Sequence, residues 1–191
     1  GFSALGGVFT AAMAQRFAAA ITNVRGEIEQ LETSFTVLLR SKSAADKMLA
    51  DMKQYAITTP LELDGIARAG QTMLGFGIAA EKVLPILKQI GDVSMGDAGK
   101  FQSLTLAFSQ MSATGHLMGQ DLLQMINAGF NPLMEISEIT GKSLGELKKE
   151  MEKGAISVEM VENAFISATS EGGKFHGMLE KQGQGIKGLQ A

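Results

Sequence analysis

Cysteine and tryptophan are absent from this 191-residue chain, and proline occurs only three times. Without cysteine the chain can form neither disulfide bonds nor thiolate zinc sites, a composition that suits a reducing cytoplasm. Aromatic residues make up 6% of the chain and charged residues 19%, below the ~25% usual for soluble domains. Because 45% of the residues are apolar and 12 are methionine, we expect a core of Met, Leu and Ala side chains.

A surplus of basic residues is also missing. The chain carries 17 Lys and Arg residues against 20 Asp and Glu, a net charge of −3 at pH 7. Phosphate backbones are bound chiefly by clustered basic side chains, so we expect no direct binding of nucleic acid by this segment. The apolar start of the chain lacks the basic region of a secretory signal. Arg16 also interrupts it before the ~20 residues that span a bilayer.

The chain does contain a long stripe of apolar residues near its N-terminus. They recur about every 3.6 positions, as residues on one face of an α-helix do. The stripe consists of Phe9, Met13, Phe17, Ala20, Val24, Ile28, Leu31, Phe35 and Leu38. This spacing predicts one straight helix of about 45 Å, or two helices broken at Gly26. We expect Phe9, Met13, Phe17 and Val24 to form a face for a partner or for self-association. Burial of the same face in the core is the alternative.

The rest of the chain is predicted to form shorter helices with recognisable ends. Side chains that can cap a first turn occur at Ser43, Thr59, Asn131, Ser143 and Ser157, and Pro60 and Pro132 suit first turns. Helix-ending glycines are Gly115, Gly129, Gly141 and Gly154. The predicted helices cover 8–40, 44–57, 60–74, 80–95, 97–113, 120–128, 132–140, 144–153, 158–169 and 175–187. Pro85 fits the fourth helix if that helix starts near Glu81, which places the proline in the first turn.

No segment alternates in the manner of a strand, so the predicted fold class is all-α, a long N-terminal helix followed by a compact bundle of shorter helices. We divide the chain into three parts. Residues 1–41 form a long amphipathic helix or a helical hairpin arm, residues 42–182 a compact helical domain, and residues 183–191 a flexible exit segment. The glycine-led start and the abrupt end indicate a segment of a longer protein.

Two glycine-containing sequences resemble nucleotide-binding motifs but lack their context. Gly183 to Gly188 has the spacing of the dinucleotide fingerprint, yet it follows a helical segment instead of a strand. Gly141-Lys142-Ser143 lacks the leading glycine of a P-loop, so Ser143 is better explained as a helix cap. We predict no cofactor.

Titratable residues form no catalytic pattern either. His116 and His176 are the only histidines, and neither has a second ligand four residues away, so we predict no metal site. Glu146 and Glu150 have lysines at the three- and four-residue spacing of a solvated helix face. We therefore predict no catalytic residue and no enzyme activity. Hydrolysis of cell walls remains a weaker alternative.

Several short sequences occur in an order that resembles the tape measure domain of phage and prophage tail proteins. They are Arg25–Glu32, Thr58–Leu63, Leu74–Glu81, Ile90–Asp92, Gly119–Gly129, Asn131–Glu135, Ser143–Glu146, Gly154–Ser157 and Glu171–Phe175. The resemblance covers residues 22–191. One departure is Asn131, since similar domains more often run from glycine and an aliphatic residue directly into the proline.

The resemblance implies a structural protein of the virion tail lumen, made in the cytoplasm of the host bacterium. Such a protein takes part in tail length determination, in tail assembly and in DNA ejection. The partners it implies are tail tube subunits, tail assembly chaperones, tail-tip proteins and other copies of the chain. The alternative is a membrane-active helical domain, which would contact the membrane through the N-terminal amphipathic helix during DNA delivery.

Overall fold

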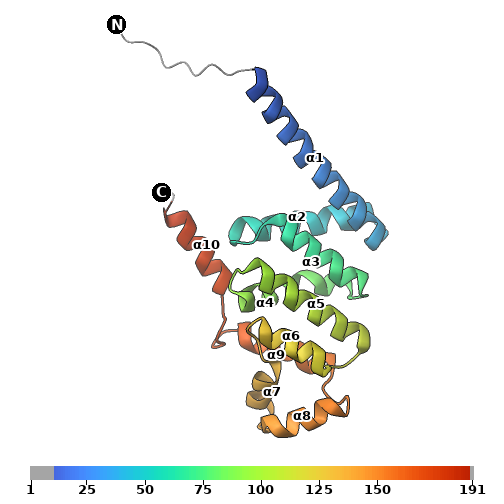
Figure 1. Cartoon of the computed structure of the whole chain (residues 1–191), viewed down its shortest axis with the longest axis vertical. Coiled ribbons are helices and arrows are strands. Elements are labelled where there is room, and N and C mark those ends of the chain that lie inside the picture. The colour runs from blue at the N-terminus through green and yellow to red at the C-terminus, as the bar shows by residue number, and fades with distance from the viewer. Residues whose placement is uncertain (1–10, 190–191) are drawn as a thin grey trace. The chain divides into compact units, whose positions relative to one another are not determined.

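Ten α-helices follow one another along residues 11–189, the part of the chain that the computed structural model describes (Figure 1). The first five are α1 (Ala11–Leu39), α2 (Lys42–Thr58), α3 (Leu63–Gly75), α4 (Ala80–Ser94) and α5 (Ala98–Thr114). The others are α6 (Gly119–Asn127), α7 (Pro132–Thr140), α8 (Leu144–Glu152), α9 (Val158–Thr169) and α10 (Met178–Leu189). No strand occurs within that part of the chain, which confirms the all-α prediction.

The N-terminal helix is long and uninterrupted. α1 passes through Gly26 without a break, so the hairpin alternative is wrong. A Cβ added at Gly26 would meet no other atom within 4 Å, and this glycine therefore marks neither a turn nor a close contact. The predicted start of the helix, at residues 8–10, lies outside the described residues.

The chain divides into two compact units, Gly1–Ala45 and Asp46–Ala191. α2 begins in the first unit and continues into the second. The three predicted parts, with boundaries after residues 41 and 182, stay a prediction. The predicted exit segment 183–191, however, is helical as far as Leu189, because α10 extends to that residue.

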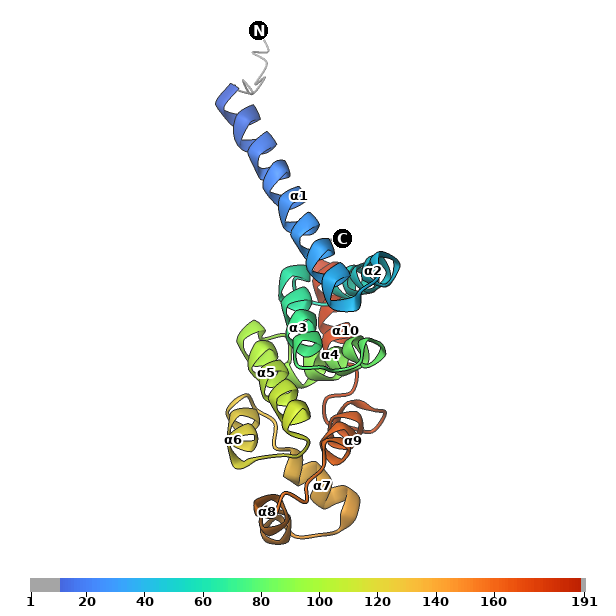
Figure 2. The same ribbon diagram turned by 90° about the vertical axis from the view of Figure 1, so that its right-hand side faces the viewer.

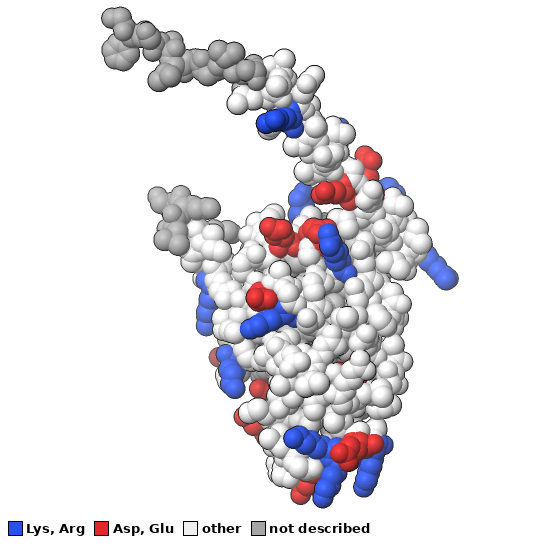
Figure 3. Space-filling model, viewed as in Figure 1, with Lys and Arg blue, Asp and Glu red and all other residues white. Residues whose placement is uncertain are grey.

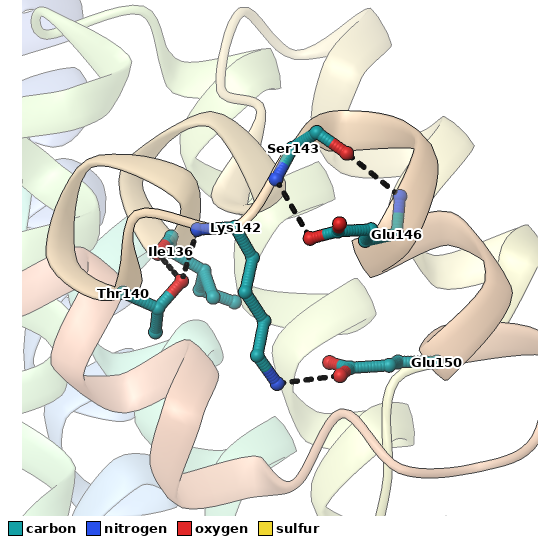
Figure 4. A network of polar contacts seen from close by, with 6 residues as sticks. All are labelled: Ile136, Thr140, Lys142, Ser143, Glu146 and Glu150. Atoms are coloured by element: carbon teal, nitrogen blue, oxygen red, sulfur yellow. Dashed lines mark hydrogen bonds and ion pairs between the residues drawn. The ribbon is translucent and has the colours of Figure 1, made fainter.

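Three predicted caps hold the starts of α7, α8 and α9. The side chains of Asn131 and Ser157 accept hydrogen bonds from the amides of Leu133 (3.1 Å) and Met160 (3.2 Å). In α8 the bonds are reciprocal, as Figure 4 shows: the Glu146 amide donates to Ser143 Oγ, and the Ser143 amide donates to Glu146 Oε2, both at 3.2 Å. Asn131, the residue at which the chain departs from similar domains, thus caps α7 in the ordinary way.

Replacing the α8 cap should cost a measurable part of the stability. We expect Ser143→Ala to lower the free energy of unfolding by about 1 kcal/mol, because the amide of Glu146 loses its acceptor. Urea denaturation followed by circular dichroism measures this. Lys148→Ala, at an exposed position of the same helix, is the control and should change stability by less than about 0.5 kcal/mol. Equal losses in both variants would contradict the assigned cap.

Two other predicted caps are wrong. At the start of α2 the Ala44 amide donates to Ser41 Oγ (3.1 Å), so the cap is Ser41 and not Ser43. Thr59 does not start α3; its hydroxyl donates to the Tyr55 carbonyl oxygen (2.9 Å) and so belongs to the end of α2. Because α3 begins only at Leu63, the predicted start at residue 60 is three residues early.

Pro85 lies deeper in its helix than predicted. α4 begins at Ala80, so Pro85 falls in the second turn and not in the first. Its ring nitrogen carries no hydrogen for the carbonyl of Glu81, and α4 therefore lacks one internal hydrogen bond. Four buried aliphatic side chains hold α4 in place despite this loss: Val83, Leu87, Ile90 and Val93.

The second unit is built around buried aromatic side chains. Phe165 of α9 is fully buried and packs against Phe108 of α5, with ring centroids 5.8 Å apart in an edge-to-face arrangement. The Phe130 ring, from the loop before α7, lies 4.4 Å from the Phe165 ring and 6.5 Å from the Phe175 ring. Figure 2 shows α3, α5, α6 and α8 succeeding one another along this unit. The aromatic cluster thus joins helices from the middle and the end of the sequence.

Candidate functional site

The predicted partner face lies on α1, and the part of it that can be described is exposed. The exposed fractions are 56% for Met13, 64% for Phe17 and 55% for Val24, whereas Phe9 lies outside the described residues. Ile21, which the prediction omitted, is 50% exposed. The prediction followed a 3.6-residue periodicity, which includes Ala20 in the stripe and leaves out the adjacent, larger Ile21. Whether this face binds a partner stays a prediction.

The stripe is not uniform along α1. Phe35, near the end of the helix, is fully buried, and Leu31 is half-buried, whereas Ile28 is still 38% exposed. The stripe is therefore exposed as far as Ile28, covered at Leu31 and Phe35, and exposed again at Leu38 (41%). The alternative for the predicted face, burial in the core, is not observed for Met13, Phe17 and Val24.

The sequence with dinucleotide-fingerprint spacing lies within a helix. Gly183 is buried in α10, where a Cβ would collide with the carbonyl oxygen of Thr58 in α2. The glycine is thus required for close packing of α10 against the end of α2. Gly185 meets nothing within 4 Å, so these glycines do not act together as a phosphate-binding loop.

The Gly141-Lys142-Ser143 sequence is a helix connection. Gly141 ends α7 with a φ of 75°, a conformation that glycine adopts readily. Lys142 Nζ lies 2.5 Å from Glu150 Oε1, and its amide donates to Thr140 Oγ1 (Figure 4). Ser143 caps α8. The side chains of Lys142 and Ser143 are therefore both engaged with α8.

The histidines lie apart and contact the backbone. His116, in the loop between α5 and α6, pairs with Ser157 in an isolated antiparallel bridge. His176 Nδ1 lies 3.1 Å from the carbonyl oxygen of Thr169. Among residues 11–189, no three His, Cys, Asp or Glu side chains are placed to share a metal ion.

A cavity of about 330 Å³, which no sequence pattern predicted, lies beside α2, α4 and α10. Its lining includes Tyr55, Lys88, Asp92 and Glu180. The Tyr55 hydroxyl is buried without a hydrogen-bond partner, and burial, with the charge of Asp92 second, raises the pKa of this phenol. Lys88 Nζ lies 5.8 Å from the centre of the Tyr55 ring.

The Asp92 carboxylate holds the N-terminus of α10. Its Oδ1 accepts a hydrogen bond from the Leu179 amide at 2.9 Å, and nearby Gln182 Nε2 donates to the Met95 carbonyl oxygen at 3.1 Å. Burial raises the pKa of Asp92, opposed by the Leu179 hydrogen bond and by His176. These groups attach α10 to α4. Their geometry accounts for the docking of a helix and provides no nucleophile with a paired base.

Charges are dispersed over the face shown in Figure 3, and a broad region of that face carries none. Lysine and arginine side chains there are interspersed with carboxylates, and charges of both signs lie together at the end where Figure 1 places α8. This distribution provides no continuous basic track. None of the helices within residues 11–189 is both long enough and apolar enough to span a bilayer.

Residues 19–191 match the family model of the tape measure proteins. The chain belongs to the tape measure protein family. The match confirms the resemblance predicted from the ordered motifs and begins three residues earlier than the predicted start at 22. No curated protein and no solved structure matches the chain.

Membership assigns this tape measure segment to the phage tail and to a structural role. The family is not known for enzyme activity. The two most prominent features of residues 11–189 fit a structural role. One is the exposed stripe of α1, and the other is the attachment of α10 around Tyr55 and Asp92.

The raised pKa of Asp92 predicts how the stability of this tape measure segment varies with pH. The folded chain binds the Asp92 proton more tightly than the unfolded chain does. The resulting stabilisation is complete below the ordinary aspartate pKa and is lost as the pH rises through the folded-state pKa. Asp92→Asn keeps an oxygen for the Leu179 amide but has no charge. We therefore expect its free energy of unfolding to fall less steeply with rising pH than that of the unaltered chain.

Urea unfolding at a series of pH values measures this slope. Asp92→Ala is the control, because it removes the acceptor as well as the charge and should be less stable than Asp92→Asn at every pH. An Asn variant with the same pH dependence as the unaltered chain would show that Asp92 does not titrate as assigned.

Proposed function

We propose that this segment is a structural, non-enzymatic module of a phage tail tape measure protein. It acts in tail tube length determination and tail assembly, and the protein leaves with the DNA during ejection. The family match over residues 19–191 carries the proposal. The whole protein is made in the host cytoplasm and then lies in the lumen of the tail tube.

Length measurement by such a protein has a simple physical basis. A continuous helix rises ~1.5 Å for each residue, so the number of residues sets a length at which tube growth ends. The second unit of this chain is folded around the Phe165 cluster and would add little length for its number of residues. Its role is therefore to bind tail components during assembly, while extended parts of the protein provide the ruler.

The partners of this module are tail tube subunits, tail assembly chaperones and tail-tip proteins of the same phage. Isothermal titration of the purified chain against each of these three tests the proposal. We expect specific binding of at least one, and we expect a chain unfolded by a core substitution to lose it. If the folded chain bound none of the three, the assembly role would be refuted. Release of soluble products from peptidoglycan would refute the non-enzymatic role.

Membrane binding during DNA delivery is the alternative, and the exposed apolar face of α1 favours it. Sedimentation with vesicles of phosphatidylethanolamine and phosphatidylglycerol tests this function. Binding that is abolished by Phe17→Glu would support it. Vesicle binding that is unchanged by this substitution, or absent, would exclude α1 as a membrane anchor.

A further inference from the structure

α10 is attached to the rest of the second unit by few contacts. Within the part of this helix whose side chains are described, only Leu179 and Gly183 are buried. The Leu179 amide donates to Asp92 Oδ1 (2.9 Å), and Gln182 Nε2 donates to the Met95 carbonyl oxygen (3.1 Å). The cavity of about 330 Å³ is lined jointly by α2, α4 and α10, so their contact is incomplete. An element with so few buried contacts opens at a low cost in free energy.

Beneath α10 lies a hydroxyl group that the docked helix leaves unsatisfied. Tyr55 is only 8% exposed, and its Oη has no hydrogen-bond partner within residues 11–189. Tyr55 Oη and Leu179 Cδ1 both meet the position that a Cβ on Gly91 would occupy, so Leu179 lies close to this hydroxyl. A buried donor without an acceptor costs free energy, and water removes this cost once the leucine moves away. The docked position of α10 is weakened accordingly.

The connection before α10 consists of an anchored part and a joint. The Phe175 amide donates to the Ala168 carbonyl oxygen (2.9 Å), and His176 Nδ1 lies 3.1 Å from the carbonyl oxygen of Thr169. The next residue is Gly177, with a φ of 62°, and glycine changes its backbone conformation more readily than other residues. The chain is thus attached to α9 as far as His176, and rotation at Gly177 moves α10 alone.

We propose that α10 is a lid, hinged at Gly177, that opens and closes over Tyr55 while the rest of the second unit stays folded. α10 has twelve residues, three of them glycine, so it does not persist as a helix once it is undocked. Opening therefore exposes Leu179 and the Tyr55 hydroxyl to solvent and frees the amides of α10. The lid is a property of the folded chain and does not depend on the assembly role proposed above.

Native-state hydrogen exchange of the full chain tests whether α10 opens as one unit. We expect the amides of residues 181–186 to share one opening constant that changes little in low urea, because opening exposes little surface. Amides of α5 and α9 should exchange through global unfolding, with a steep dependence on urea. Exchange that quickens residue by residue toward Leu189 would instead indicate fraying of a helix end. That result would overturn the lid.

Ser143→Ala separates opening of the lid from global unfolding. This substitution destabilises the second unit at the start of α8, so exchange in α5 and α9 should quicken about fivefold. Exchange in α10 should not change, because the lid opens without unfolding α8. Equal acceleration in α5, α9 and α10 would show that α10 unfolds only with the whole unit, which the proposal excludes.

Tyr55→Phe and Asp92→Ala should change the opening of the lid in opposite directions. Tyr55→Phe removes the unsatisfied hydroxyl and keeps the ring, so exchange in α10 should slow about tenfold. Asp92→Ala removes the acceptor of the Leu179 amide, so exchange in α10 should quicken about tenfold. Faster exchange in Tyr55→Phe would show that the hydroxyl is satisfied in the closed form, and this explanation of the lid would then be wrong.

The exposure of Tyr55 can be followed directly, because it is the only tyrosine of the chain. Acetylation of its hydroxyl by N-acetylimidazole, located by mass spectrometry, measures the open fraction. Gly183→Ala, which displaces α10 without a change of charge, should raise the rate about tenfold, whereas Ser143→Ala should leave it unchanged. Acetylation of Tyr55 only at urea concentrations that also unfold α5 and α9 would contradict the lid.

Discussion

Phe165→Ala should lower the free energy of unfolding by about 3–5 kcal/mol, the largest loss that we expect from a single substitution in this chain. Phe165 is fully buried, and its ring contacts Phe108 and Phe130. Removing the ring leaves a cavity between α5, α9 and the loop before α7, and backbone atoms cannot move far enough to fill it. Chemical denaturation of the purified chain, followed by circular dichroism, measures the loss.

The neighbouring residue provides the control. Ile166 is 45% exposed, so Ile166→Ala should change stability by less than about 1 kcal/mol. Similar losses in the two variants would show that the aromatic cluster is not the centre of the second unit.

Gly183→Ala should lower the free energy of unfolding by about 1–3 kcal/mol and expose α10 to solvent. The added methyl group would collide with the backbone of Thr58, which cannot rotate away as a side chain can. α10 must then move, and the hydrogen bond from the Leu179 amide to Asp92 is lost with it. Amide hydrogen exchange should show faster exchange in α10 than in α5 or α9.

Gly185→Ala is the matched control in the same helix. Its added methyl group meets nothing within 4 Å, so the better helix propensity of alanine should raise stability by about 0.5–1 kcal/mol. A destabilised Gly185→Ala, or a Gly183→Ala variant with native protection of α10, would contradict the assigned packing of this helix.

Helices with local start and stop signals could be predicted from the sequence. The α8 cap needs only Ser143 and Glu146, three residues apart, and the end of α7 needs only Gly141. Such contacts arise within one turn, so they are visible in neighbouring letters of the sequence. The errors at Thr59 and Pro85 have a different cause. The Thr59 hydroxyl bonds back to the Tyr55 carbonyl oxygen, so this residue belongs to the end of α2 and not to the start of α3. α4 does begin at the predicted residue 80, but Pro85 lies in its second turn, where the buried side chains of α4 offset the missing hydrogen bond.

The candidate sites were predicted less completely, because their residues are far apart in the chain. Asp92 and Leu179 are separated by 87 positions, and no spacing rule connects them. Tyr55 likewise meets α4 and α10 only after folding. The α1 stripe was predictable because a single helix carries it. Which part of it is exposed, and that Ile21 is exposed with it, could be seen only in the folded structure.

In-frame removal of residues 46–189 from the whole tape measure protein tests the account most directly, with tail lengths measured by electron microscopy. A folded assembly module has a diameter of about 40 Å, so tails that still form should shorten by no more than that, while their number falls. An extended ruler segment would behave differently. Removal of its 144 residues at ~1.5 Å each would shorten every tail by roughly 200 Å, and that result would contradict the account.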